Sequence, residues 1–243
     1  ANTLNISGNY TSSGTDNLTA ATVDYNGAGA QTVLGTTYNT LNLSGGGIKT
    51  AGGAITTTNV ANTATFALGA NTLNISGAFS GAGTYAFATG TVNYTGAVPQ
   101  NILATTYGNL GFSNSIKTPL GNISTGNLTN IGTAFDLGAN TLNISGAYTS
   151  TGTDDFTTGT VDYNGAGAQT VLSTTYNDVI FSGGGTKTAA GALDINGNIT
   201  INDATTFADG GFFHRVAGNW TENDAGAQRT GAGSIIFDGG GVS

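Results

Sequence analysis

The dominant feature of the sequence is an internal repeat with a period of about 69 residues. The heptapeptide NTLNISG occurs at residues 2–8, 71–77 and 140–146. The triplet TTY keeps the same period at 36–38, 105–107 and 174–176. Self-similarity at a fixed period is typical of repeat architectures, in which each unit buries its apolar face against the next. We therefore divide the chain into units 1–70, 71–139 and 140–211 and an atypical partial unit 212–243, and we expect them to form one elongated domain, 1–243.

The register of the atypical unit is ambiguous from the sequence. Residues 226–228 and 235–241 match 167–169 and 179–185. Alternatively, VAGNW at 216–220 matches ISGAY at 144–148. The two alignments differ by about one strand.

Apolar and polar residues alternate within each unit, as in the pairs Leu4 and Ile6, and Val23 and Tyr25. A period of two predicts half-buried β-strands. Clusters of Gly, Asn and Ser at 26–29 and 44–47 separate the strands and are typical of turns. Because no stretch of a dozen residues has a helical period, we expect almost no helix.

The spacing of these strands predicts an all-β fold, a parallel β-solenoid built from the long repeats. The landmarks in the first unit are Leu4, Val23, Leu41, Ile55 and Leu73, at irregular intervals of about 14 to 19 residues. Coils of roughly 17 to 24 residues would stack at the spacing of paired strands, about 4.8 Å. The alternative is a tandem of antiparallel β-sandwich domains, each small for a sandwich without disulfides.

The composition excludes several classes of function. Five Lys and Arg against 13 Asp and Glu give a net charge of −8, so the chain has no basic face for nucleic acid. No apolar run approaches the roughly 18 residues of a membrane helix, and we expect no membrane insertion. The chain has no Cys and hence no disulfide or thiolate metal site. A hydrophobic fraction of 38% with only 7% charged residues argues against disorder.

The motifs GTVDYNGAGAQTV at 159–171, TTYN at 174–177 and SGGGTKT at 182–188 resemble the repeats of large bacterial surface proteins. Those proteins are Cys-free, adhesin-like or filament-forming exoproteins with parallel β-helix repeats. The resemblance covers essentially the whole chain and follows 212–243 loosely. It implies a secreted bacterial scaffold, extracellular or at the cell surface, for adhesion, matrix or fibre building, and it implies no catalytic residues.

Ionisable side chains are too scarce to suggest an enzyme. The single His, His214, lacks a nearby nucleophile motif, and we interpret it as a terminal cap or edge residue. A carbohydrate-cleaving site would need clustered carboxylates beside a cation, and the best set is Asp162, Asp178 and Lys187. Both carboxylates are Asn in the second unit, and we expect the lysine of each unit to offset local negative charge. We predict no catalytic residues, with a carbohydrate-binding or carbohydrate-cleaving β-helix as the alternative function.

We expect no cofactor, and calcium is the one metal that the sequence leaves open. Oxygen ligands on tight turns are what calcium needs. The candidate pairs are Asp16-Asn17, Asp154-Asp155 and Asn202-Asp203. The second unit carries Tyr85 in place of Asp16 and Asp154, which favours ordinary turn capping.

Aromatic residues give the remaining binding signal. Tyr38, Tyr107 and Tyr176 share one repeat position, out of phase with the apolar residues that follow. If stacking of the coils aligns them in an exposed row, they would hold the sugar rings of surface glycans. The alternative is a buried aromatic ladder. For the in-phase set, Tyr25, Tyr94 and Tyr163, we predict the core.

Open strand edges pair with other chains unless they are capped. We predict a subunit junction in which Leu4 and Ile6 meet Phe212, Phe213 and Trp220 of the next copy, head to tail; the alternative is a terminal cap. Such contacts give open filaments. The sequence thus predicts a non-enzymatic extracellular structural or adhesive repeat protein, a subunit or segment of a cell-surface or matrix fibre.

Overall fold

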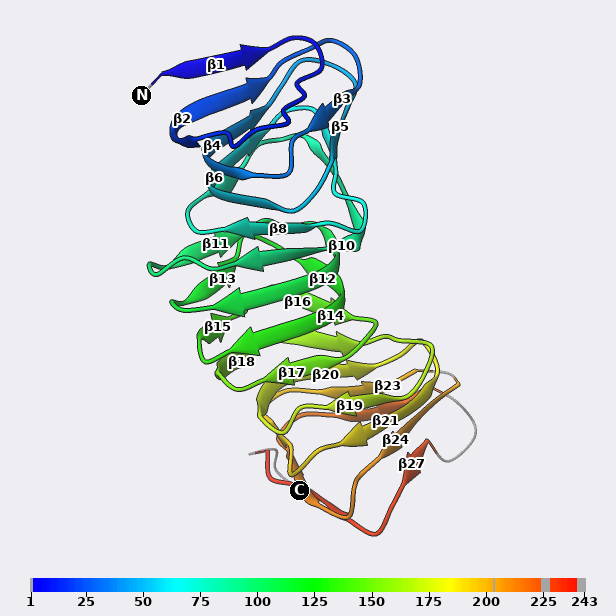
Figure 1. Cartoon of the computed structure of the whole chain (residues 1–243). Coiled ribbons are helices and arrows are strands. Elements are labelled where there is room, and N and C mark those ends of the chain that lie inside the picture. Colours follow the sequence, from blue (N-terminus) through cyan, green and yellow to red (C-terminus); the bar gives the residue numbers. More distant parts are fainter. Residues whose placement is uncertain (1, 203, 224–227, 240–243) are drawn as a thin grey trace. The chain divides into compact units, whose positions relative to one another are not determined.

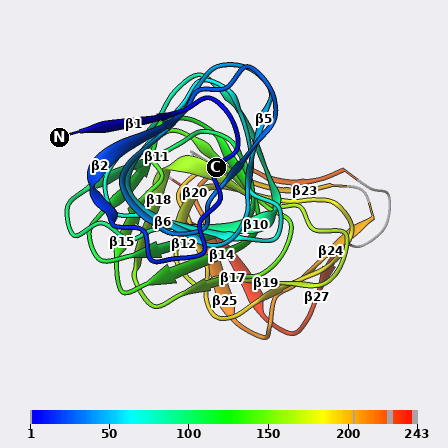
Figure 2. The same ribbon diagram turned by 45° about the horizontal axis from the view of Figure 1, so that its top comes forward.

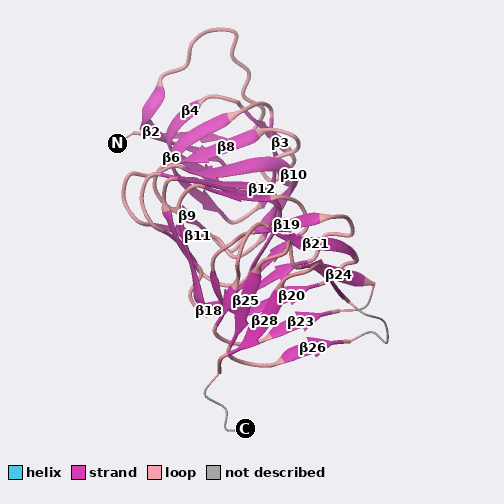
Figure 3. Ribbon diagram, turned by 90° about the horizontal axis from the view of Figure 1, so that it is seen from below, coloured by secondary structure: helices cyan, strands magenta, loops and turns pink. Residues whose placement is uncertain are grey.

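The computed structural model describes residues 2–202, 204–223 and 228–239. This part of the chain contains strands and no helix (Figure 3). No helix in it has the length and apolar character needed to cross a bilayer. The strands pair in parallel and stack into a β-solenoid of about 12 turns with about 19 residues per turn. This confirms the predicted fold class, and the tandem-sandwich alternative, which requires antiparallel pairing, is wrong.

The chain forms two compact units, 1–120 and 121–243, and their boundary falls inside the second sequence repeat. The first unit contains β1 (Thr3–Ile6), β2 (Leu18–Tyr25), β3 (Gln31–Val33), β4 (Thr37–Leu43), β5 (Ile48–Ala51), β6 (Ile55–Asn62), β7 (Thr65–Ala67), β8 (Thr72–Ile75), β9 (Phe79–Ser80), β10 (Thr84–Tyr94), β11 (Gln100–Ile102), β12 (Thr106–Ser113) and β13 (Lys117–Pro119). The second contains β14 (Ile123–Ile131), β15 (Ala134–Asp136), β16 (Thr141–Ile144), β17 (Tyr148–Ser150), β18 (Thr153–Tyr163), β19 (Gln169–Val171), β20 (Thr175–Phe181), β21 (Gly185–Ala189), β22 (Asp194–Ile195), β23 (Ile199–Ile201), β24 (Thr205–Ala208), β25 (Phe213–Val216), β26 (Trp220–Glu222), β27 (Arg229–Thr230) and β28 (Ser234–Phe237).

Each unit has a long and a short strand face. In the first unit the long face runs β1, β2, β4, β6, β8, β10, β12, each strand parallel to the next (Figure 1). Its short face contains β3, β5 and β7 with the start of β10, and the coils circle a common interior (Figure 2). In the second unit β20 pairs with both β22 and β23, which continue to β25 and β26, and β28 follows β25. The short face there is β19, β21, β24 and β27.

The predicted alternation places the apolar residues inside. Val23 lies opposite Leu41, and Tyr25 lies opposite Leu43, and all four are fully buried. Their polar neighbours on the same strands remain partly exposed. The core of the described chain is therefore the one that the period-two pattern predicts.

Equivalent residues of successive repeats do not stack on one another. The ladder that starts at Leu4 continues through Val23, Leu41 and Val60 to Phe79, whereas Leu73, the equivalent of Leu4, lies opposite Ile55 in a different row. The reason is that the sequence repeat spans several coils of about 19 residues each and is not a whole multiple of one coil. The expected rows of repeat-equivalent side chains are therefore absent from the described ladders.

Glycines at one corner allow the coils to approach closely. Gly45 has φ 71°, and a Cβ on it would overlap the carbonyl oxygen of Asn26. Its equivalent Gly183 has φ 77°, and a Cβ there would overlap the carbonyl oxygen of Asn164. Both the left-handed backbone and the contact with the preceding coil restrict these positions to Gly.

A buried Gln at a second corner joins adjacent coils. The Oε1 of Gln100 accepts the Gly96 N–H at 2.6 Å, and its Nε2 donates to the carbonyl oxygens of Ile75 at 3.1 Å and Gly77 at 2.7 Å. Gln31 and Gln169 make the equivalent three contacts. One side chain thus satisfies backbone groups that the turn leaves outside the ladder.

The lysine of each repeat is fully buried beside this corner, at positions 49, 117 and 187. Lys49 Nζ donates to the carbonyl oxygens of Gly27 at 2.6 Å and Gly46 at 2.8 Å, and to Oε1 of Gln31 at 2.8 Å. Burial lowers the pKa of Lys117 to about 8, and it lowers the pKa of Lys49 and Lys187 as well. The lysines therefore hold backbone oxygens inside the fold, and two of them, Lys49 and Lys187, also interact electrostatically with Asp24 and Asp162, in line with the expected offset of local negative charge.

The lowered lysine pKa predicts a pH dependence of stability. Between pH 8 and pH 10 the unfolded chain keeps a proton on Lys117, whose ordinary pKa is 10.5, that the folded chain loses. Stability rises with pH wherever the unfolded state binds more protons, so we expect the denaturant midpoint to rise across this window. Above pH 10 the raised pKa of buried tyrosines such as Tyr94 reverses the trend. Urea titrations of the wild type and of Lys117→Met test this: the variant should show a smaller rise, and an identical rise would contradict it.

Candidate functional site

Tyr38, Tyr107 and Tyr176 are buried, so the prediction of an exposed sugar-stacking row is wrong. The inward phase changes within β4, where two partly exposed residues, Asn39 and Thr40, separate the buried Tyr38 from the buried Leu41. Tyr38 lies opposite Leu18, and the pairing with β2 changes register at the same place, between Leu18 and Thr22. The same register shift occurs after the pair Phe87 and Tyr107 in the second repeat and after the pair Phe156 and Tyr176 in the third.

These tyrosines form an internal hydrogen-bond chain with the in-phase tyrosines. The Leu103 N–H donates to the Tyr94 hydroxyl at 3.0 Å, and the Tyr107 hydroxyl donates to the Leu103 carbonyl oxygen at 2.7 Å. The two hydroxyls lie 3.0 Å apart, so Tyr94 donates to Tyr107. The backbone N–H and the carbonyl oxygen of Leu103 are thereby both satisfied. The same chain occurs around Leu34 and Leu172, and burial raises the pKa of Tyr163 to about 12.

The carboxylates considered for calcium have protein partners. Asp154 Oδ1 accepts from the Tyr148 hydroxyl at 2.5 Å and from Asn130 Nδ2 at 2.8 Å. Asp16 Oδ1 accepts from the Tyr10 hydroxyl at 2.6 Å. Asp155 Oδ1 accepts from the backbone and hydroxyl of Thr157. Of these three, only Asp155 makes the backbone contact of a turn-capping residue, whereas Asp16 and Asp154 bind tyrosine hydroxyls.

The second repeat replaces this tyrosine and aspartate together. Phe79 and Tyr85 occupy the two positions, and their rings meet edge to face with centroids 5.3 Å apart. A hydrogen-bonded pair in the first and third repeats thus becomes an aromatic pair in the second. In the described ranges no three His, Cys, Asp or Glu residues lie together as a metal site would require, and Asp203 lies outside those ranges.

The set considered for a cleaving site does not form an accessible site, although Asp162 and Lys187 interact electrostatically. Asp162 on β18 accepts from the Ser182 hydroxyl at 2.7 Å, and burial raises its pKa. Asp178 Oδ1 caps the backbone N–H of Asn198 at 2.7 Å. Lys187 lies on the short face, where its Nζ donates inward to a carbonyl oxygen. An accessible acid and base on one face are therefore not formed by these three residues.

Strand pairing resolves the register of the atypical unit. Val216 pairs with Ile195 in the same way that Ile75 pairs with Thr57. Phe237 pairs in turn with Val216, and it therefore corresponds to Tyr94, which pairs with Ile75. The alignment of 216–220 with 144–148 is therefore the correct one. In this alignment the strand TLNI of the other units becomes FHRV at β25, so that a histidine, an arginine and an exposed phenylalanine enter the repeat.

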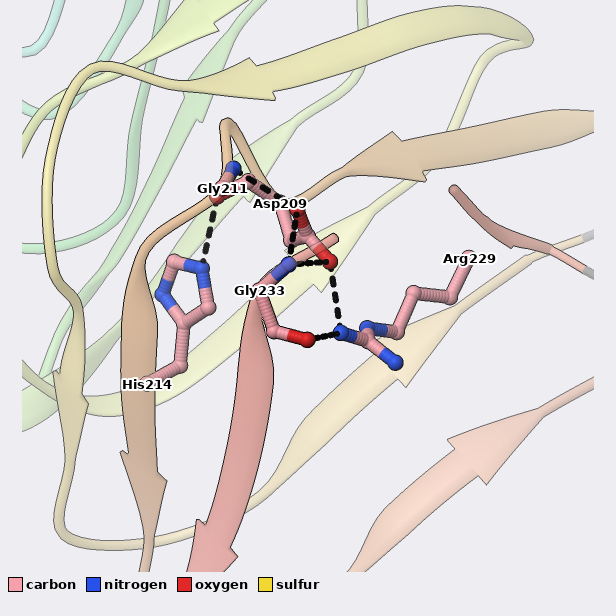
Figure 4. A network of polar contacts seen from close by, with 5 residues as sticks. All are labelled: Asp209, Gly211, His214, Arg229 and Gly233. Atoms are coloured by element: carbon pink, nitrogen blue, oxygen red, sulfur yellow. Dashed lines mark hydrogen bonds and ion pairs between the residues drawn. The ribbon is translucent and has the colours of Figure 1, made fainter. Parts of the chain in front are cut away.

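A buried carboxylate organises the last coils (Figure 4). Asp209 is fully buried and accepts from Arg229 Nη2 at 2.5 Å, the Gly211 N–H at 2.8 Å and the Gly233 N–H at 3.1 Å. Burial opposes ionisation of Asp209, but the two backbone donors and the arginine outweigh it and lower the pKa. The carboxylate thus ties β24 to the turns before β25 and β28.

His214 is a core residue of this cluster, so its interpretation as an edge residue is wrong. It is buried, and its Nδ1 accepts the Leu193 N–H at 3.1 Å. The hydrogen must then be on Nε2, which donates to the Asp209 carbonyl oxygen at 2.9 Å. Both ring nitrogens are occupied, which leaves none for proton transfer to a substrate.

The predicted junction residues fall on different surfaces. Leu4 on β1 is 39% exposed, and Ile6 is buried. Phe213 is exposed on the outward face of β25, which lies between β22 and β28, and Phe212 precedes it. Trp220 is half-buried with its ring centroid 6.1 Å from that of Phe207.

The sequence analysis did not select Phe237. It continues the inward phase of Val216 on β28 and is 63% exposed. Residues 234–237 read SIIF, with three apolar residues in succession, so the pattern does not say which of them point inward, and the register of this unit was ambiguous.

The tyrosine chain predicts a specific loss of stability. We expect Tyr107→Phe to lower the free energy of unfolding by about 1 to 3 kcal/mol, because the Leu103 carbonyl loses its buried donor. Tyr85→Phe is the matched control, since its hydroxyl bonds Gly81 at the surface, and its effect should be below about 0.5 kcal/mol. Urea unfolding measures both, and equal effects would contradict the assigned role.

The Asp209 cluster predicts a second difference between matched variants. Asp209→Asn leaves Arg229 without its charged partner, and we expect a loss of about 3 kcal/mol. Asp238→Asn breaks the exposed pair with Arg215 and should cost less than about 1 kcal/mol. Hydrogen exchange on β25 and β28 locates the loss, and unchanged protection in Asp209→Asn would rule out this role.

Comparison of the chain with protein-family models, with curated proteins and with solved structures found no match.

Proposed function

We propose that this chain is a non-enzymatic extracellular structural repeat protein, a subunit or segment of a cell-surface or matrix fibre, which associates with its own copies head to tail. The observation that carries the proposal is the exposed inner face of two outer strands. Leu4 on β1 is 39% exposed, and its ladder partner Val23 is fully buried. Phe237 on β28 is 63% exposed, and its partner Val216 is fully buried.

Each of the two outer strands carries two inward-facing apolar residues. Inward residues occur two apart on each, Leu4 and Ile6 on β1 and Ile235 and Phe237 on β28. Among the described strands, β1 pairs with β2 and β28 pairs with β25, each in parallel. A second copy whose β1 continues the ladder of β28 would cover both apolar faces and satisfy both edges. Because the two surfaces differ, the contact repeats without closing and gives a filament.

The use of polar groups inside the coils supports a structural role. The tyrosine hydroxyls, the corner glutamines and the buried lysines all bond to backbone groups of the stack. Side chains committed in this way stabilise the scaffold and are not available to a substrate. The surface location is supported by the resemblance of the repeats to those of bacterial surface proteins and by a Cys-free chain, which an oxidising exterior tolerates.

Self-association is tested by negative-stain electron microscopy and light scattering over a concentration series. We expect filaments from the wild type, and shorter or no filaments from Leu4→Ser and Phe237→Ser. Val98→Ser is the matched control, because Val98 is also 63% exposed but precedes β11 on a turn. It should assemble as the wild type does.

Two results would overturn the proposal. A wild-type chain that stays monomeric at every concentration has no head-to-tail contact. Filaments that persist in the double variant Leu4→Ser, Phe237→Ser would show that another surface forms them.

A further inference from the structure

A groove of about 450 Å³ lies on the outward surface of the second unit. Its lining includes the side chains of Asp194, Phe213 and Arg215, with Thr174 and Thr175 beside them. This volume is within the range of small-molecule sites, about 300 to 1,000 Å³. The groove is separate from the apolar inner face of β28.

Strand register brings these side chains together. Thr175, Asp194 and Arg215 are successive ladder partners across β20, β22 and β25. They point outward because Tyr176, Ile195 and Val216, one position later, point into the core. Phe213 is two residues before Arg215 and therefore on the same outward face.

The same row in the first unit has none of this chemistry. There the ladder partners are Thr37, Thr56 and Asn74, and Thr72 occupies the position of Phe213. The repeat thus supplies an uncharged reference row of the same backbone geometry. In the second unit that row has gained a carboxylate, a guanidinium group and an aromatic ring.

These groups can bind both the apolar C–H face and the hydroxyl groups of a sugar ring. Phe213 is 68% exposed, so its ring offers an apolar surface to the C–H face of a pyranose. The Asp194 carboxylate accepts hydrogen bonds and makes none with the described residues, and the Arg215 guanidinium group donates them. Neighbouring hydroxyls of a sugar both donate and accept, so a carboxylate beside a guanidinium group can bind two of them. Arg215 Nη1 bonds Asp238 at 2.9 Å, which holds the guanidinium group in place and leaves its other donors free.

The local charge selects among saccharides. Arg215 is accompanied by two carboxylates, Asp194 and Asp238, in a chain of net charge −8. An anionic sugar would meet net repulsion here. We infer that the Phe213 groove binds a hexose unit of a neutral oligosaccharide, an activity that goes beyond fibre building and does not depend on it.

The inference is tested with three neutral trisaccharides of different linkage: maltotriose, cellotriose and mannotriose. Saturation-transfer NMR and calorimetry are done on the Leu4→Ser chain, so that assembly does not affect the result. We expect at least one of them to bind, with Phe213→Leu and Asp194→Asn each weakening affinity by about tenfold or more. Phe213→Tyr keeps the ring and should retain binding. Phe237→Leu, which removes an exposed ring outside the groove, is the matched control and should also retain it.

Several outcomes would overturn the inference, provided that circular dichroism shows every variant folded. They are the absence of binding by all three trisaccharides, full binding by Phe213→Leu, and equal loss in Phe237→Leu. Tighter binding of trigalacturonate than of any neutral trisaccharide would exclude the neutral class. None of these results affects the filament experiment, so the two proposals fail separately.

Discussion

Parallel hydrogen bonding between successive coils is the constraint on which the rest of this structure depends. It requires the chain to return to the same place after about 19 residues, one strand spacing further along. Side chains that point inward must then fit between two neighbouring coils. Backbone groups at the corners, which the ladder does not reach, need other partners.

The buried polar residues meet this second requirement. Gln100 binds three backbone groups from two coils, and the pair Tyr94 and Tyr107 satisfies the backbone N–H and carbonyl oxygen of Leu103. Lys49 donates to oxygens of two turns. These buried polar side chains therefore bind mainly to backbone groups, which accounts for a stable interior in a chain with so few charges. The groove at Phe213 is an exception, because its polar groups face solvent.

The sequence predicted the solenoid and its core because the period-two pattern is local. Val23 and Leu41 alternate with polar residues, and such a pattern determines which face of a strand is buried. The position of Tyr38 could not be predicted in this way, since the inward phase changes within β4, between Tyr38 and Leu41, where its pairing with β2 also changes register. Irregularities of this kind are set by pairing between coils, which a single strand does not reveal.

The candidate sites were harder to predict for the same reason. Two alignments of the atypical unit matched the sequence equally well, and only pairing of Val216 with Ile195 distinguishes them. Without that register, His214 looked like an edge residue, and Asp194 and Arg215 were far apart in the sequence with nothing to connect them. The burial of the lysines was not predicted, because a buried ammonium group surrounded by carbonyl oxygens leaves no mark in the composition.

The small height of each coil has a mechanical consequence. A coil occupies about 4.8 Å of a stack, yet its roughly 19 residues span about 60 Å when extended. The strands lie across the stack and the hydrogen bonds between neighbouring coils run along it, so tension along the stack separates the outermost coil before the inner ones. Each coil that detaches lengthens the chain by more than ten times the height it occupied. A stack of this kind therefore lengthens under load in small steps, one coil at a time.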